Sequence, residues 1–284
     1  MPLVTTEVIE QFQKTGYSVL ENLLSPEECD QLRSKSKKCI EDLDMQTHPK
    51  TIFSTENQNN DKYFIESQDK IRFFFEENVF DDKGNLTREK QLAINKIGHG
   101  LHYVDDDYKS VTHHAVVQEF FKKANFNQPV IVQSMVIFKQ PQIGGVVLPH
   151  QDATFLMTSP SKVMGVWIAL EDADLENGCL WFIPGSHTRA ITRKMIRNPD
   201  KNGPITIFTN PPDEFDDSQF VAVPVKKGSA VIIHGHVVHK SEKNLSTRSR
   251  EIYTYHVAES HNTEWCAENW LQPSGSYQFP KLYT

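Results

Sequence analysis

The chain has 284 residues, of which 38% are hydrophobic and 24% charged, a balance typical of a folded globular protein with a sizeable core. Its formal net charge of -7 argues against nucleic acid or an anionic membrane as the main partner, because either would favour a basic surface. We therefore expect the partner to be a small molecule.

Helical signals dominate the first part of the chain. Ser25-Pro26-Glu27-Glu28 predicts the capped start of a helix, and apolar residues follow it at helical spacing as far as Leu43. Further helical patterns cover about Thr87 to Lys96 and about Val111 to Ala124. The sequence thus predicts a helical part over about residues 1–127, whose helices flank a sheet.

From Pro129 onward the pattern changes to short runs rich in valine, isoleucine and aromatic residues, which is typical of strands separated by turns. Evenly spaced short strands predict a barrel or jelly roll, with the helices packed on one outer face. We expect one mainly β domain with flanking helices over residues 1–284, with its β core at about residues 128–260. The candidate strands are Val130 to Phe138, Val146 to Asp152, Val163 to Leu170, Cys179 to Ile183, Phe220 to Val223, Ala230 to His234 and Glu251 to Val257.

A long polar connection, residues 191–218, interrupts these strands. Connections of this length are usually functional lids or disordered insertions. We favour a lid, because the connection joins strands on either side of the candidate metal ligands. Its basic residues could meet an anionic substrate, although a solvated run of charges is the simpler interpretation. They are Arg193, Lys194, Arg197 and Lys201.

The start of the chain, Met1 to Glu7, lacks the basic and apolar regions of a secretory signal, and no stretch approaches the roughly eighteen apolar residues of a membrane span. We expect a cytoplasmic protein. The four cysteines, Cys29, Cys39, Cys179 and Cys266, are too few and too scattered for a disulfide scaffold or a zinc motif. We expect free thiols, with the first two buried by the helix that follows Ser25.

His150-Gln151-Asp152 is the only place where a carboxylate follows two residues after any of the twelve histidines. Residues two apart on an extended strand point the same way, so this imidazole and carboxylate could bind one ion. Two histidines and one carboxylate form the facial triad of non-haem Fe(II) oxygenases, which leaves three positions on the ion open. The motif alone is a weak signal, because an aspartate at the end of a strand often forms a turn.

The third ligand is expected among His234, His236 and His239, which follow an apolar strand. We choose His239, because a polar pattern that runs through Ser241 to Arg250 begins at this residue. The other histidines have no comparable partners, so we expect them to be surface residues or satisfied core residues. They are His48, His99, His102, His113, His114, His187, His256 and His261.

Arg250 meets a second requirement of such chemistry. Oxygenases of this type need an electron source, and 2-oxoglutarate provides one by chelating the ion and losing CO2 as dioxygen is split. The distal carboxylate of 2-oxoglutarate needs a cation, and a guanidinium matches it with two parallel hydrogen bonds. Ser241, on the same side as His239 if that segment is extended, could donate another. Taken alone, Arg250 is more simply an ordinary surface arginine at the start of a strand.

Together these residues resemble the phytanoyl-CoA dioxygenase family of Fe(II)/2-oxoglutarate oxygenases. The matching segments keep the order of the family over about Lys96 to Arg250, which is more specific than any single motif. They are Asn95-Lys96-Ile97-Gly98-His99, Gln133-Ser134-Met135, Pro149-His150-Gln151-Asp152, Trp167-Ile168-Ala169-Leu170, Glu176-Asn177-Gly178-Cys179-Leu180, Ile183-Pro184-Gly185-Ser186-His187, and the pattern of His239, Ser241, Asn244, Ser246 and Arg250.

The resemblance implies a double-stranded β-helix core, that is, a cupin-like jelly roll. It also implies iron held by His150, Asp152 and His239, dioxygen as co-reactant, and 2-oxoglutarate placed against the first two of these ligands. The further residues implied to hold 2-oxoglutarate are Lys96, Met135, Trp167, Ser241 and Arg250. Simpler interpretations are a core tryptophan at Trp167, a gap-filling Met135 and a solvated Lys96 at the end of a helix.

The implied reaction is hydroxylation of a small or lipid-like substrate, with release of succinate and CO2. The carboxylate of Asp152 favours hydroxylation over halogenation, because halogenating relatives have a small residue there and bind halide instead. An acyl-CoA is the substrate suggested by the resemblance, although we find no residues that specifically bind adenine or a thioester.

Two other functions are possible. The first is a module that binds metal and 2-oxoglutarate without productive oxidation of a substrate. The second is a zinc hydrolase with the same three ligands and a bound water, which would leave Arg250 and Ser241 without a role.

Overall fold

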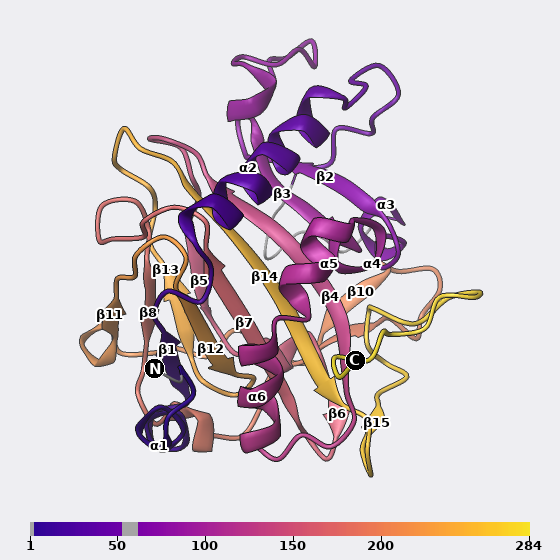
Figure 1. The fold of residues 1–284 in the computed structure, drawn as a ribbon. Helices are drawn as coiled ribbons and strands as arrows, with labels where there is room; N and C mark the ends of the chain where they lie inside the picture. Colours follow the sequence, from indigo (N-terminus) through magenta and orange to yellow (C-terminus); the bar gives the residue numbers. More distant parts are fainter. Residues whose placement is uncertain (1–2, 53–61) are drawn as a thin grey trace.

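A computed structural model describes residues 3–52 and 62–284. Two antiparallel sheets dominate it, a seven-stranded major sheet in the order β1-β12-β7-β14-β4-β3-β2 and a four-stranded minor sheet in the order β11-β8-β13-β5 (Figure 1). The strands are β1 (Tyr17–Leu20), β2 (Ile71–Phe75), β3 (Ile94–His99), β4 (Pro129–Lys139), β5 (Val147–His150), β6 (Thr158–Ser159), β7 (Val163–Ala169), β8 (Leu180–Phe182), β9 (Met195–Arg197), β10 (Thr206–Phe208), β11 (Val221–Val223), β12 (Ala230–His234), β13 (His239–Ser241), β14 (Arg250–Glu259) and β15 (Glu264–Trp265). The α-helices are α1 (Thr6–Thr15), α2 (Pro26–Glu41), α3 (Lys62–Ile65), α4 (Leu101–Val104), α5 (Asp106–Thr112) and α6 (Ala115–Lys123).

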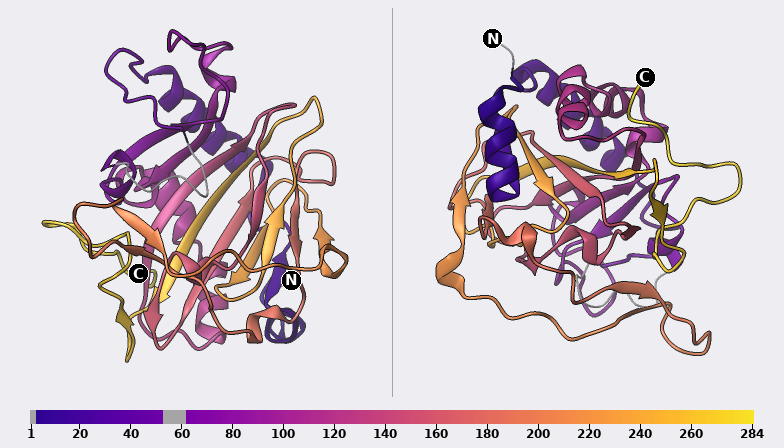
Figure 2. Two further views of the ribbon diagram at one scale, coloured as in Figure 1. Left: turned by 180° about the vertical axis from the view of Figure 1, so that it is seen from behind. Right: turned by 90° about the horizontal axis from the view of Figure 1, so that it is seen from below.

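The helices α2, α5 and α6 cover one face of the major sheet, and the minor sheet lies on its other side (Figures 1 and 2). This arrangement confirms the predicted mainly β class, with a jelly-roll core and flanking helices. Among the described residues, none of the helices combines the length and the apolar character needed to cross a membrane.

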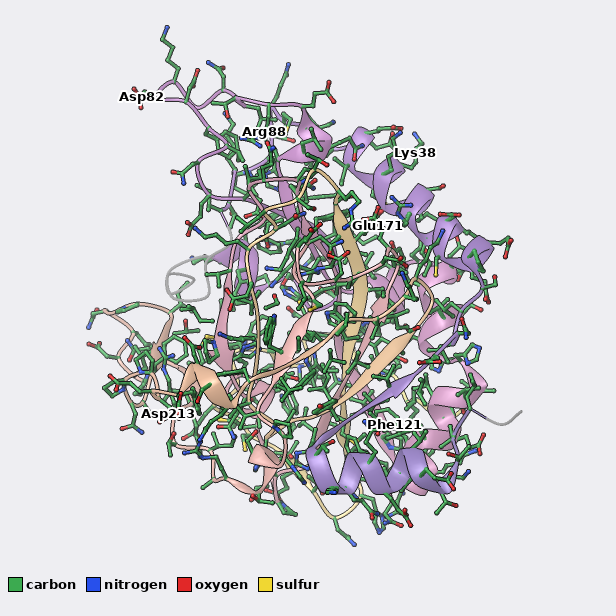
Figure 3. All side chains as sticks on the ribbon, turned by 90° about the vertical axis from the view of Figure 1, so that its left-hand side faces the viewer. Lys38, Asp82, Arg88, Phe121, Glu171 and Asp213 are labelled. Carbon is green, nitrogen blue, oxygen red and sulfur yellow. The ribbon has the colours of Figure 1, made fainter. Side chains whose placement is uncertain are left out.

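The major sheet separates two hydrophobic cores, because successive side chains on a strand point to opposite faces. On β7, Val166 and Ile168 belong to the core beneath the helices. Their neighbours Trp167 and Ala169 belong to the core between the two sheets, together with Phe182 of the minor sheet. Figure 3 draws the side chains on the ribbon. The inter-sheet space is therefore where inward-facing residues of both sheets can meet.

The helix predicted after Ser25 is confirmed. The Ser25 backbone N–H donates to Glu28 Oε2 at 2.8 Å, and the Glu28 N–H donates to Ser25 Oγ at 3.2 Å, which completes the capping box. Cys29 is buried but Cys39 is only half-buried, so the expected burial of both cysteines was correct for the first alone. All four cysteines are free thiols, as predicted.

Two other helix predictions need correction. The segment from Thr87 to Lys96 forms only a short 3-10 turn at Lys90–Leu92, followed by strand β3. Pairing of β3 with both β2 and β4 outweighs the local helical pattern there. The third predicted helix corresponds to α6 but begins four residues later than Val111, because the preceding residues end α5 and the His114 side chain accepts the N–H of Val116 at 3.2 Å and starts a new helix. The part predicted as helical also contains β1, β2 and β3.

Each of the seven predicted strands overlaps a strand of the structure, and β4 and β14 extend beyond the predicted bounds at both ends. The second is shorter than predicted, because β5 ends at His150 and Asp152 begins a 3-10 turn, Asp152–Thr154. The long connection at residues 191–218 is not without structure either, since it contains the hairpin of β9 and β10. The backbone of Ile196 forms a bridge with Asn269, which ties this hairpin to the C-terminal segment.

Buried histidines predict that the fold is sensitive to acid. His102 is buried, with Nδ1 at 2.8 Å from Ser134 Oγ, and burial lowers its pKa from 6.5 to about 3. Between these two values the unfolded chain binds a proton that the folded chain does not bind. The free energy of unfolding therefore decreases as the pH falls through this range, by about 1.4 kcal/mol per pH unit for one such group.

We expect the variant His102→Gln to show a shallower loss of stability than the wild type between pH 6.5 and pH 4.5. Urea unfolding at several pH values measures the two slopes, and the substitution His261→Gln at an exposed position is the matched control. Parallel slopes for the wild type and His102→Gln would contradict the prediction, whatever the stability of the variant at neutral pH.

Candidate metal and cosubstrate site

Strands β5 and β13 of the minor sheet bring two histidines together. His150 and His239 are paired in register, and the centroids of their rings are 4.2 Å apart. Asp152 follows in the 3-10 turn, where its Oδ1 lies 3.6 Å from His150 Nε2 and 3.7 Å from His239 Nε2. One ligand atom from each residue can be chosen so that all three lie within 4.8 Å of one another. This spacing suits a single metal ion.

Both imidazoles have the tautomer that metal binding requires. His150 Nδ1 lies 2.8 Å from the carbonyl oxygen of Leu148, and His239 Nδ1 lies 3.1 Å from that of Val237. A carbonyl oxygen only accepts hydrogen bonds, so each Nδ1 carries the proton and donates it. Each Nε2 is left with a lone pair directed toward Asp152, as in histidines whose second nitrogen is fixed by a backbone carbonyl.

The electrostatics of the three groups also suit a cation. Burial alone would raise the pKa of the Asp152 carboxyl, but the neighbouring imidazoles of His256 and His239 hold it well below its usual value. Burial and the neighbouring His150 lower the pKa of His239 to about 4. At neutral pH the site therefore presents an ionised carboxylate and a neutral His239, which are the forms that bind metal.

The middle of the major sheet continues the site. Strand β14 lies between β4 and β7, and its Ile252 belongs to the inter-sheet core whereas Tyr253 belongs to the core beneath the helices. By the alternation of a strand, Arg250, Thr254 and His256 share the inward face with Ile252. One face of β14 thus runs from Arg250 to the neighbourhood of Asp152, because His256 Nε2 lies 3.2 Å from Asp152 Oδ2.

Three of the predicted cosubstrate residues lie along this face. Met135 of β4 and Trp167 of β7 flank Thr254 in register. Lys96 is on the neighbouring strand β3, and a Cβ added at Gly98 would lie 3.3 Å from Met135 Cγ and 3.9 Å from Lys96 Cδ. The side chains of Lys96 and Met135 therefore border the same space. Lys96 is buried on a strand rather than solvated at the end of a helix, and burial lowers its pKa to about 7.

Arg250 is buried at the far end of this face, rather than exposed on the surface. Its guanidinium carbon lies 5.7 Å from the centroid of the Trp167 ring, so the side chain extends toward the middle of the face. Within the part of the chain that the structure describes, Arg250 Nε and Nη1 are buried and have no hydrogen-bond partner. Ser241, also buried, is two residues after His239 on the extended strand β13, so the two side chains share a side, as expected.

The two rival histidines lie elsewhere. His236 Nε2 lies 2.6 Å from Ser161 Oγ, and the ring of His234 stacks edge-on to His187 with centroids 5.2 Å apart. Neither belongs to the group that could hold a metal, whereas His239 does.

The geometric argument for Asp152 needs one correction. It meets His150 through a turn after the strand, not by sharing the face of an extended strand.

Sequence analysis missed three residues at this site, His256, Gln133 and Gly165. His256 was grouped with histidines that have no special partner, but it contacts Asp152. A signal was available, because His256 lies in the predicted strand Glu251 to Val257, which Arg250 directly precedes, and an even separation of six residues along an extended chain places both on the same face. The contacts of Gln133 and Gly165 with His256 depend on the pairing of β4 and β7 with β14, which no local pattern specifies.

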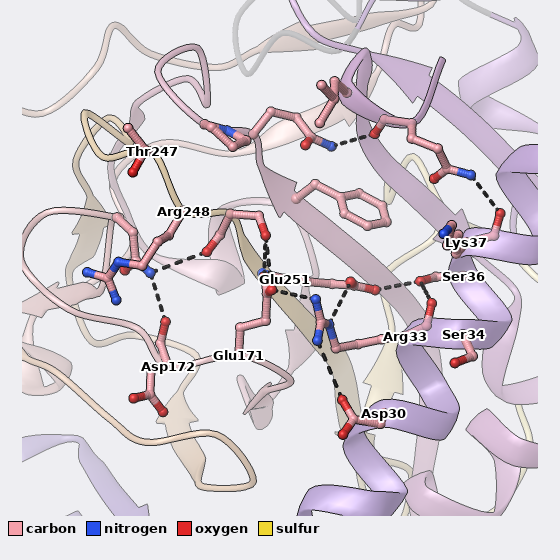
Figure 4. Close-up of a pocket in the computed structure, with 17 residues that line it drawn as sticks. Asp30, Arg33, Ser34, Ser36, Lys37, Glu171, Asp172, Thr247, Arg248 and Glu251 are labelled. Atoms are coloured by element: carbon pink, nitrogen blue, oxygen red, sulfur yellow. Dashed lines mark hydrogen bonds and ion pairs between the residues drawn. The ribbon is translucent and has the colours of Figure 1, made fainter. Parts of the chain in front are cut away.

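A cavity of about 850 Å³ lies outside the sheet face just described, between α2 and the loops around residues 171–177 and 247–249 (Figure 4). Its charged side chains bind one another. Arg33 Nη2 lies 2.5 Å from Glu171 Oε1 and Arg33 Nε lies 3.4 Å from Glu251 Oε2, while Ser36 Oγ donates to Glu251 Oε1 at 2.5 Å. This network fastens α2 to β14, and none of the predicted metal or cosubstrate residues lines the cavity.

Solved structures with the same fold include two non-haem α-ketoglutarate-dependent enzymes from nogalamycin biosynthesis. A carbocyclase is 18% identical, with a TM-score of 0.65, covering 99% of this chain and 97% of that chain. An epimerase solved in complex with Fe3+, α-ketoglutarate and nogalamycin RO is 15% identical, with a TM-score of 0.61, covering 97% of both chains. At these identities the likeness concerns the fold.

Sequence comparison is more specific. A phytanoyl-CoA dioxygenase domain-containing protein 1 from Danio rerio is 54% identical over 291 aligned positions, covering 100% of both chains. The family model described as phytanoyl-CoA dioxygenase matches residues 12–252, which include every residue of the candidate site described above except Thr254 and His256. The chain therefore belongs to the phytanoyl-CoA dioxygenase family, and it is an oxidoreductase.

Proposed function

We propose that this protein is a dioxygenase dependent on Fe(II) and 2-oxoglutarate, which hydroxylates a small, lipid-like substrate. The proposal rests on one observation: a candidate metal cluster and a buried, unpartnered guanidinium both border the space between the two sheets. A cluster of His150, Asp152 and His239 suits a metal ion, and the buried guanidinium of Arg250 has two nitrogens without a hydrogen-bond partner among the described residues. A metal hydrolase would need the cluster but would leave Arg250 without a function.

The residues present fit both groups. The ion would be held by Asp152 and by the Nε2 atoms of His150 and His239, a donor set of two imidazoles and one carboxylate that suits ferrous iron. The distal carboxylate of 2-oxoglutarate would be held by Arg250, whose unpartnered Nε and Nη1 supply the donors that such a group needs. An unpaired buried cation is costly, which is why its retention here supports an anionic ligand.

The other residues would orient the cosubstrate and keep water away from it. Ser241 is buried beside the metal cluster and can donate a hydrogen bond, while Met135 and Trp167 provide apolar contact. Bound together, ferrous iron and 2-oxoglutarate supply the oxidation, in which the keto acid and O2 become succinate and CO2 and one oxygen atom enters a C–H bond of the substrate. The chain positions these partners and excludes solvent from them.

A coupled assay tests the proposal. The purified protein is supplied with Fe(II), 2-oxoglutarate and candidate substrates, and succinate is measured with and without dioxygen. We expect succinate to form only when iron, the keto acid and dioxygen are all present. Binding of metal and 2-oxoglutarate without succinate from any substrate would instead support a binding module. Hydrolysis of a substrate that is indifferent to dioxygen and to 2-oxoglutarate would support a zinc hydrolase.

An aromatic wall next to the metal cluster supports an apolar, lipid-like substrate. The ring of Phe155 has its centroid 5.9 Å from that of His150 and 6.1 Å from that of Phe208 on β10. The guanidinium carbon of Arg193 lies 3.6 Å from the centroid of Phe208, so a positive charge borders this wall. An acyl-CoA combines an apolar chain with an anionic head group and would match both features. Acyl-CoAs of increasing chain length should then stimulate 2-oxoglutarate turnover more than polar metabolites do.

The segment at residues 191–218 would act as a lid over the substrate, because its strand β10 contributes Phe208 to this aromatic wall. A single domain is supported by the major sheet, in which β1, β2 and β3 from the first part of the chain pair with strands of the β core. Residues 1–2 and 53–61 of that proposed domain lie outside the described residues. The cytoplasmic location stays a prediction.

A further inference from the structure

A polar row crosses the major sheet next to the metal cluster. Gln133 of β4, His256 of β14 and Gly165 of β7 are neighbours in register on three adjacent strands. The next inward-facing row contains Met135, Thr254 and Trp167, so the first row is unusual in placing an amide and an imidazole beside each other in a buried layer. Buried polar groups of this kind need partners, and the partners here lead to Asp152.

The proton of His256 can be placed from its neighbours. The Gln133 amide nitrogen, a donor, lies 3.1 Å from His256 Nδ1, which therefore accepts. The ring proton is then on Nε2, and this atom lies 3.2 Å from Asp152 Oδ2. Oδ2 is buried and has no aligned hydrogen-bond donor among the described residues, so the contact with His256 Nε2 at 3.2 Å is a close approach that a small rotation of either side chain could turn into a hydrogen bond.

The two oxygens of Asp152 thus face different groups. Oδ1 lies 3.6 Å from His150 Nε2 and 3.7 Å from His239 Nε2, whereas Oδ2 lies against His256. His256 itself is outside the group of residues that could share one ion. A carboxylate placed in this way offers one oxygen to a metal and keeps the other within 3.2 Å of an imidazole nitrogen of the protein.

Gly165 provides the space for this contact. A Cβ added there would lie 3.2 Å from Asp152 Oδ2 and 3.4 Å from His256 Nε2, which is tighter than most real Cβ contacts. The backbone of Gly165 is in an ordinary strand and is not in the left-handed region, so the reason for a glycine here is room rather than conformational freedom. Any larger residue would push the aspartate and the imidazole apart.

We propose that His256 is a positioning residue which holds Asp152 Oδ2, so that Asp152 binds the metal through Oδ1 alone, with Gln133 and Gly165 fixing the imidazole in place. This inference rests on the proposed function, because it assumes that the cluster binds a divalent ion. Partners of this kind around a metal ligand typically change metal affinity by about 10-fold to 100-fold when they are removed.

The test measures metal binding rather than turnover. Co(II), which does not oxidise readily, is titrated into the wild type and into His256→Leu, His256→Gln and Gly165→Ala, with its visible absorption as the readout. The control is His261→Leu, since His261 is exposed and five residues further along. Urea unfolding of each metal-free variant records stability separately.

We expect His256→Leu to bind Co(II) about 10 to 100 times more weakly than the wild type, with an altered spectrum, because the carboxylate is free to rotate. His256→Gln should recover part of the affinity, since its amide can donate to Oδ2. Gly165→Ala, on the neighbouring strand β7, should weaken Co(II) binding several-fold, because its methyl group would crowd Asp152 Oδ2 and His256 Nε2. This variant provides the test if His256→Leu does not fold.

A purely structural role for His256 would lower the free energy of unfolding of the variants but leave their Co(II) affinity and spectrum like those of the wild type. That result would overturn the inference alone. If the wild type itself did not bind Co(II), the proposed metal site would fail and the inference with it. Equal Co(II) affinities in the wild type and in Asp152→Ala would likewise overturn both the proposed metal site and the inference.

Discussion

Replacement of Asp152 by alanine is expected to abolish coupled turnover, because it removes the only carboxylate of the candidate metal cluster. Two imidazoles would be left, with no negative charge to balance a divalent ion in a buried site. We expect metal affinity to fall by at least about a hundredfold, since removing a ligand should cost more than removing its partner. Succinate production at saturating 2-oxoglutarate should fall to background.

Two comparisons separate loss of the ligand from loss of the fold. Asp152→Asn keeps the shape of the side chain and one oxygen but lacks the charge, so it should bind metal more weakly than the wild type and better than Asp152→Ala. Asp42→Ala, at the end of α2 where the side chain is 62% exposed, should behave like the wild type. Succinate is measured by a coupled assay and metal affinity by titration. Turnover by Asp152→Ala at the rate of the wild type would remove the basis of the metal assignment.

The residues of the metal cluster could be found in the sequence because the signals are local. His150 and Asp152 are two residues apart, and His239 begins the polar pattern that runs through Ser241 to Arg250 along the chain, so each is marked by residues close to it in the sequence. The capping box at Ser25 is local in the same sense, since all of its hydrogen bonds join residues three apart. The strands of the β core were also predictable, because alternation and turn residues are written along each of them.

The contacts across the sheet could not be predicted in the same way. Lys96 was placed at the end of a helix, and it lies on a strand because β3 pairs with β2 and β4. The approach of His256 to Gly165 depends on the register between β14 and β7, and a shift of one residue would turn His256 to the helix side. Long-range register of this kind is decided by packing of the whole sheet, not by a local pattern.

Replacement of Arg250 is expected to affect 2-oxoglutarate rather than the metal. Loss of two charge-assisted hydrogen bonds should cost about 3 kcal/mol or more, which corresponds to a KM for 2-oxoglutarate raised roughly a hundredfold. Arg250→Lys should recover only part of this, because an ammonium does not form the two parallel hydrogen bonds of a guanidinium. Affinity for Co(II) in the absence of 2-oxoglutarate should be unchanged, because Arg250 is not part of the metal cluster.

The same residue should show a conflict between binding and stability. Burial lowers the pKa of Arg250 to about 10, and two of its nitrogens have no hydrogen-bond partner in the described part of the chain, so the ligand-free fold carries an uncompensated buried cation. Arg250→Met, which fills similar space without charge, should therefore raise the free energy of unfolding of the ligand-free protein while it loses cosubstrate affinity.

Arg248→Ala is the matched control, since Arg248 is two residues earlier and 53% exposed, where it binds Asp174. Urea unfolding and the KM for 2-oxoglutarate measure the two effects, and a KM unchanged in Arg250→Met would show that the anionic group binds elsewhere.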